Sequence, residues 1–332
     1  MRSCCQSPEW WRAGFSLIEV CLSVLVLLLV LSALNQAMSS VSRSWSAADD
    51  PFGEASTAFE TITQSLAHST LEPYSDYADA GGAFSTSGSP GFAPDHLARR
   101  SDLAFVCGPG ISLLAGSNRT TATDGVFFVE PGGETVTNAQ DGLNHLFNAR
   151  GFFVEFGPDT DAPSFFLGTP RLRWRLKEIA QPSESLQVFG STSSAPWVSQ
   201  LTGPGTTTDV LAENVIALVI LPEPAANDGS GVFRATFAYD SRDTGNALTF
   251  AQLPPRVHVV LAAIDEASAG RAAAQNGTTA PTLVPPRLFQ DPTQLDSDLA
   301  TLDISLTAAR VRHRFFQRDL DLLASSWSAS NP

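Results

Sequence analysis

The chain has 332 residues, of which 43% are hydrophobic and only 16% are charged, and this apolar content excludes an intrinsically disordered chain. Lys and Arg total 20 against 34 Asp and Glu. The resulting net charge of −14 argues against nucleic-acid binding, which normally needs a basic surface. The single lysine, Lys177, does not follow a glycine-rich loop, which excludes a P-loop nucleotide site.

The first predicted element is an apolar segment at residues 15–34, which reads FSLIEVCLSVLVLLLVLSAL and contains one charge, Glu19. Twenty helical residues span about 30 Å, the thickness of the hydrocarbon core of a bilayer. Arg2 and Arg12 precede the segment and mainly acidic residues follow it, so the positive-inside rule places the N-terminus in the cytoplasm. The sequence therefore predicts a single-pass membrane protein with a cytoplasmic N-terminus and an exported C-terminal domain.

A secretory signal peptide is the competing interpretation of this segment. Signal peptides have a shorter apolar core, of about 7 to 15 residues. A carboxylate inside the membrane costs on the order of 3 kcal/mol at the helix centre and usually has a functional partner. Glu19 therefore favours a retained membrane helix over a signal peptide.

The residues around Glu19 carry a resemblance to a known family. Residues 14–20, GFSLIEV, resemble the class III signal of type IV pilins and type II secretion pseudopilins. The resemblance implies cleavage after Gly14, N-methylation of Phe15, and pairing of Glu19 with the N-terminal amine of a neighbouring subunit. It also implies three kinds of partner: other pilin-like subunits, a prepilin peptidase/methyltransferase and an inner-membrane assembly platform.

The motif divides the N-terminal region into a leader peptide, 1–14, and a transmembrane and assembly helix, 15–37. An amphipathic helical continuation is expected over 38–72, because apolar residues recur there at helical spacing. This stripe consists of Ala55, Phe59, Ile62 and Leu66. Pro51 predicts a break within the continuation and Pro73 predicts its end.

The remaining chain, 73–332, is expected to form an exported β-rich globular domain. Runs of β-branched and aromatic residues alternate there with turn residues. Strands are predicted at residues 102–107, 125–130, 151–156, 171–179, 214–221, 232–239, 256–264 and 311–323, and a helix at 296–309. The predicted fold class is α+β, pilin-like, with a long N-terminal hydrophobic helix followed by a mostly antiparallel β-sheet domain.

Several segments of this domain resemble the family called Verru_Chthon cassette protein C, whose members are pilin-like proteins encoded in multi-protein cassettes. The segments are residues 99–103, 105–109, 151–157, 211–215, 239–242 and 253–268. The C-terminal third also resembles, more weakly, the J-class minor pseudopilin of type II secretion. Neither resemblance implies catalytic residues.

A basic cluster stands out on this acidic chain. Arg171, Arg173, Arg175 and Lys177 alternate with apolar residues, which places the cations on one face of a strand. One interpretation is a docking face for an acidic neighbour. The other is a solvated strand face whose opposite side packs Trp174 into the core.

Other polar residues give no specific support for a metal site, a cofactor or catalysis. The acidic run Asp291, Asp296, Asp298 and Asp303 lacks the glycine of a calcium loop, so it favours helix capping. The adjacent pair Asp265–Glu266 cannot face across a cleft as glycosidase carboxylates do. Cys107, with apolar neighbours, is predicted to be buried and reduced, or paired between chains.

These observations predict a structural role and no enzymatic one. The expected function is a minor pilin or pseudopilin of a type II secretion or type IV pilus-like filament, processed by a prepilin peptidase. The alternative is a periplasmic binding or enzymatic domain that uses the N-terminal helix only as a tether.

Overall fold

The computed structural model describes residues 50–85, 91–115, 119–136, 143, 145–158, 171–186, 207–225 and 231–329. The predicted leader, 1–14, and the predicted transmembrane and assembly helix, 15–37, lie outside the described residues. The same holds for the first part of the expected helical continuation, up to residue 49.

The first described helix is α2 (Gly53–Ala67), which begins two residues after Pro51. Its apolar stripe is buried, as the sequence predicted, and Ile62 and Leu66 have no exposed surface. The helix ends at Ala67, earlier than expected, because the main chain then joins the sheet, where Thr70 N–H donates to the carbonyl of Val129 at 2.9 Å.

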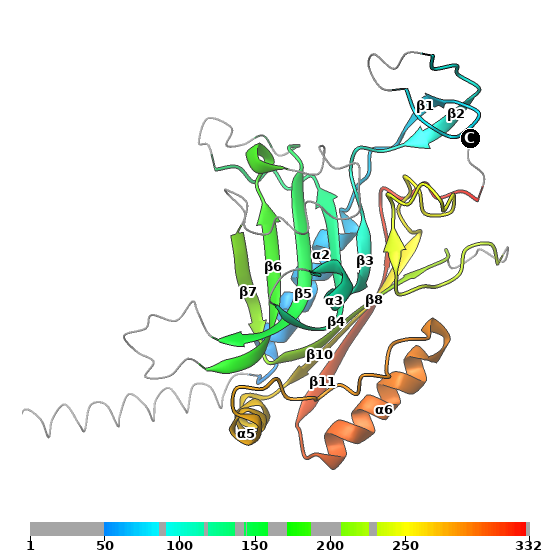
Figure 1. Cartoon of the computed structure of the whole chain (residues 1–332). Helices are drawn as coiled ribbons and strands as arrows, with labels where there is room; N and C mark the ends of the chain where they lie inside the picture. Colours follow the sequence, from blue (N-terminus) through cyan, green and yellow to red (C-terminus); the bar gives the residue numbers. More distant parts are fainter. Residues whose placement is uncertain are drawn as a thin grey trace, which may run out of the picture. The chain divides into compact units, whose positions relative to one another are not determined.

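A six-stranded antiparallel sheet forms the larger layer, with the strand order β7-β6-β5-β4-β3-β9 (Figure 1). Its strands are β3 (Val106–Pro109), β4 (Thr120–Glu130), β5 (Asn148–Pro158), β6 (Leu172–Gln181), β7 (Thr207–Glu213) and β9 (Tyr239–Asp240). A short helix, α3 (Gly110–Leu113), follows β3. A separate hairpin pairs β1 (Tyr74–Ala78) with β2 (His96–Arg100).

A three-stranded antiparallel sheet has the order β11-β10-β8, from β8 (Val215–Glu223), β10 (Arg256–Ile264) and β11 (His313–Asp321). Helices α5 (Glu266–Asn276) and α6 (Leu295–Ala308) cover one face of it. Its other face packs against the six-stranded sheet and α2. Two short 3₁₀ turns are η2 (Ser183–Ser185) and η4 (Pro292–Gln294).

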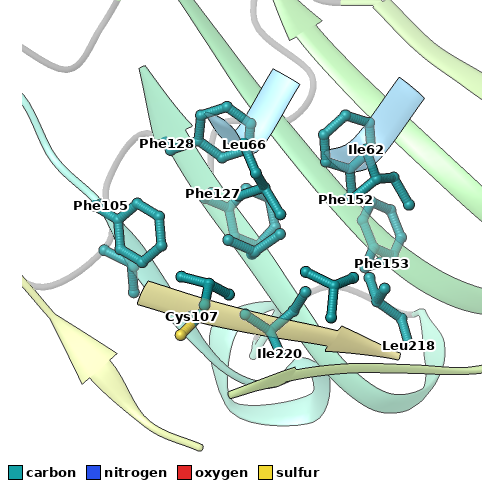
Figure 2. Packing of buried hydrophobic residues seen from close by; sticks show 14 of the residues in the cluster. Ile62, Leu66, Phe105, Cys107, Phe127, Phe128, Phe152, Phe153, Leu218 and Ile220 are labelled. Carbon is teal, nitrogen blue, oxygen red and sulfur yellow. The ribbon is translucent and has the colours of Figure 1, made fainter. Parts of the chain in front are cut away.

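Phenylalanine rings from neighbouring strands pack on both faces of the six-stranded sheet, in the core that it shares with α2 and the three-stranded sheet (Figure 2). The rings of Phe127 and Phe153 stack at 6.4 Å between centroids, and those of Phe128 and Phe152 lie 6.0 Å apart. Gly151 on β5 lies directly opposite Phe127 on β4. A Cβ atom at Gly151 would overlap the Phe127 ring, so this glycine is required by close packing.

The predicted fold class is wrong for the part of the chain that the structure describes. This part is sheet-rich, its longest helix is the 15-residue α2, and an α+β fold built on a long apolar N-terminal helix is not supported. The expected transmembrane helix also lacks support, because within the described ranges no helix has the length and apolar character needed to cross a membrane. The apolar residues here lie instead in strands such as β8, which is buried on both faces.

Individual strand positions agree better with the sequence. Strand β10 has the predicted bounds, 256–264, and α6 lies within one residue of its prediction. In contrast, only the end of the predicted strand 232–239 pairs in a sheet, at β9. The β1–β2 hairpin and α5 were not predicted.

Candidate functional site

The residues predicted to direct processing and assembly are Gly14, Phe15 and Glu19, and all three lie outside the described residues. Their roles stay predictions. What the structure does describe is how α2, the first described element after this segment, is attached to the domain.

Helix α2 makes polar contacts with both sheets. Ser65 Oγ donates to Glu130 Oε2 on β4 at 2.6 Å, within the protein interior. On the exposed side, the guanidinium of Arg318 on β11 donates to both carboxylate oxygens of Glu60, at 2.7 and 2.6 Å. Together with the apolar stripe, these contacts fix α2 to both sheets.

Arg150 on β5 organises the carboxylates around this attachment. It pairs with Glu130, Glu134 and Glu178, and its own side chain is largely buried. Burial alone would lower the pKa of Arg150, but the neighbouring carboxylates raise it above its ordinary value. Burial also raises the pKa of Glu178, and Arg150 opposes that change. The cluster therefore joins one largely buried cation to three carboxylates, of which Glu130 and Glu178 are largely buried and Glu134 is exposed.

The predicted basic face on β6 turns mainly toward the protein. Arg173 is 9% exposed and Arg175 is 1% exposed, so the solvated-face interpretation is wrong for both. Arg173 Nη2 donates to Glu266 Oε1 at 2.8 Å, and Arg175 Nη1 donates to the carbonyl of Gly157 at 2.7 Å.

Glutamates from other elements cover this basic row. Glu213 contacts Arg175 at 3.4 Å and Arg171 at 3.5 Å. Burial would raise the pKa of Glu266, but hydrogen bonds from Arg173 and Asn214 hold it below the usual value. Lys177 is half-buried on the same strand. The docking role of Arg171, Arg173, Arg175 and Lys177 stays a prediction, and a neighbour would compete there with internal carboxylates.

The acidic residues weighed as calcium ligands lie apart from one another, at helix starts or in an ion pair. Asp291 accepts a hydrogen bond from Thr293 N, and Asp296 and Asp298 lie in the first turn of α6. Asp303 pairs with His313. The described residues contain no group of three or more His, Cys, Asp or Glu side chains that could hold a metal ion.

The other residues that the sequence singled out occupy structural positions. Asp265 caps α5 by accepting a hydrogen bond from Ser268 N at 2.8 Å, and the neighbouring Glu266 faces β6. Cys107 is a free, buried thiol, and burial raises its pKa well above the usual value. Burial of Cys107 agrees with the sequence prediction.

Sequence reasoning missed a group of polar residues at a bulge in β4. The register against β5 shifts between Ala122 and Gly125, and Thr123 there has a left-handed backbone with φ of 53°. Asp124 is 3% exposed, and burial raises its pKa to about 7. It lines a cavity of about 420 Å³ together with Thr121. The sequence signal was faint, because Asp-Gly inside a strand-like run is typical of a turn.

No protein-family model matches the chain, and no curated protein shows significant similarity to it. The resemblances drawn from the sequence motifs therefore stay predictions.

Proposed function

We propose that the protein is a structural subunit of a type II secretion or type IV pilus-like filament, processed by a prepilin peptidase. The observation that carries the proposal is the contiguous motif GFSLIEV at residues 14–20. The proposal includes neither the predicted pilin-like fold nor the membrane-spanning helix. It depends on cleavage after Gly14 and on an N-terminal segment that contacts neighbouring subunits.

The attachment of α2 supports a subunit that is held through its N-terminal segment. Helix α2 is the first described element that follows that segment in the chain. Helix α2 contacts β4 through Ser65 and β11 through the exposed Glu60, and its buried apolar stripe holds it in the core.

The proposed partners are other pilin-like subunits, a prepilin peptidase/methyltransferase and an inner-membrane assembly platform, with the described domain in the periplasm. Glu19 is the proposed contact, because its carboxylate attracts the positively charged N-terminal amine of a neighbouring Phe15.

The proposal is tested by co-purification of partner subunits with the Glu19→Ala variant. We expect normal expression and a several-fold loss of every pilin-like partner, because the variant removes the carboxylate that pairs with the neighbour's amine. Glu19→Asp keeps the charge but shortens its reach, so its recovery of partners should be intermediate.

A domain that is merely tethered would behave differently in this experiment. It predicts that Glu19→Ala and Glu19→Asp recover the same partners as the wild type. Wild-type recovery of every partner by Glu19→Ala would therefore refute the assembly role.

A further inference from the structure

The cavity beside β4 combines an apolar wall with a small polar patch. Its volume is about 420 Å³, which is within the range of small-molecule sites. The proline-rich residues 280–290 form one wall, and Trp174 Nε1 fixes that wall by donating to the carbonyl of Pro281 at 3.1 Å. Ile111 lies at the rim and is 75% exposed, so the cavity is accessible from solvent.

The polar patch contains a buried carboxylate without a cationic partner. Asp124 Oδ2 accepts one hydrogen bond, from Ile220 N at 3.1 Å. Among the described residues, no Lys, Arg or His contributes to the electrostatic environment of this carboxyl group. A buried carboxylate without a counter-charge is costly, and a cationic group in the cavity would relieve that cost.

A second polar group lines the same cavity. Thr121 Oγ1 is buried and has no hydrogen-bond partner in the described structure. The oxygen itself is closed to a water-sized molecule, so a ligand could reach it only if the cavity wall moved. Asp124 is therefore the polar group that the cavity offers to a ligand head group.

We propose that this cavity binds a small organic amine, with its ammonium group on Asp124 and its apolar body against Trp174 and residues 280–290. The charge decides the ligand class, because an ammonium neutralises the buried carboxylate, whereas an anion would be repelled by it. The apolar side chains of residues 280–290 favour an apolar ligand body, and the volume limits this body to about the size of one or two rings.

The inference is tested by calorimetric titration of the purified full chain with matched probes. Phenethylamine and tryptamine are compared with 2-phenylethanol and tryptophol, which replace the ammonium by a hydroxyl group on the same apolar body. We expect each amine to bind at least tenfold more tightly than its alcohol. Asp124→Asn should remove this preference, whereas Asp209→Asn, at an exposed position on β7, should retain it.

A second pair of variants tests the site without altering the core. Ile111 is exposed at the rim, so Ile111→Lys and Ile111→Gln should both fold. The added cation of Ile111→Lys should weaken amine binding several-fold and leave alcohol binding unchanged, and Ile111→Gln should change neither.

Three results would overturn the inference. They are equal affinities of the amines and alcohols for the wild type, no binding of either amine at 10 mM, and an unchanged preference for amines in Ile111→Lys or in folded Asp124→Asn. All of these readouts are independent of partner recovery, so they do not depend on the proposed assembly role.

Discussion

Strand β4 carries two buried carboxylates, Asp124 at its bulge and Glu130 at its C-terminal end, and the surroundings of the two differ. Asp124 is 3% exposed and Glu130 is 7% exposed. Glu130 pairs with Arg150 and accepts a hydrogen bond from Ser65 on α2. Asp124 accepts a hydrogen bond from the main chain of Ile220 and has no ion pair among the described residues.

The difference shows that burial alone does not give a carboxylate a structural role. At Glu130, opposite charges from β5 and a hydroxyl from α2 hold three elements together. At the other end, Thr123 and Asp124 accept the N–H groups of Leu218 and Ile220 on β8 at 2.9 and 3.1 Å. These two side chains satisfy main-chain N–H groups of β8, which is an edge strand of the three-stranded sheet. They provide no counter-charge for Asp124, which lines a cavity.

The largest expected effect comes from removing the cation at the Glu130 end. Arg150→Met would leave Glu130 and Glu178 buried without their counter-charge, and the free energy of unfolding should fall by roughly 3–5 kcal/mol. Urea denaturation at neutral pH measures this loss.

The matched control for that variant is Arg318→Met. Its partner Glu60 is mostly exposed, so water replaces the lost ion pair and the urea midpoint should hardly change. Equal losses in the two variants would contradict the role assigned to Arg150.

The next effect concerns the pH dependence that Asp124 confers. Its pKa is about 7 in the folded protein against 3.8 for the ordinary carboxyl group, so the folded state binds the proton more tightly. Protonation of Asp124 therefore stabilises the folded state fully below pH 4, and this contribution to the free energy of unfolding is lost as the pH rises through 7. Asp124→Asn removes this titration. The stability of the variant relative to the wild type should therefore increase by on the order of 4 kcal/mol between pH 4 and pH 8.

Denaturation series at several pH values, with the wild type and Asp124→Asn side by side, measure this difference. Other titrating groups cancel in the comparison because both proteins share them. A stability difference that is independent of pH would show that Asp124 titrates normally.

A smaller effect is expected midway between the two carboxylates, at Gly151. Gly151→Ala would push a methyl group into the Phe127 ring, and overpacking of this kind costs about 1–3 kcal/mol. Gly157→Ala on the same strand is the control, because open space surrounds that position. Thermal unfolding should separate the two variants, and equal unfolding temperatures would contradict the close packing at Gly151.

Sequence periodicity located most strands and the buried stripe of α2, because alternation and helical spacing reflect which face of an element is buried. It could not show what covers that face. The alternation in β6 predicted a cationic face, but the carboxylates that cover it come from Glu213 and Glu266, distant in sequence. Asp124 was missed for the same reason, since its cavity is completed by residues 280–290.

The central claim, that the chain is processed as a filament subunit, is tested most directly by mass spectrometry of the N-terminus of the purified protein. Cleavage between Gly14 and Phe15, with methylation of the Phe15 amine, is the predicted result. An intact N-terminus at Met1, or cleavage after Ala33 as in a secretory signal peptide, would contradict the account.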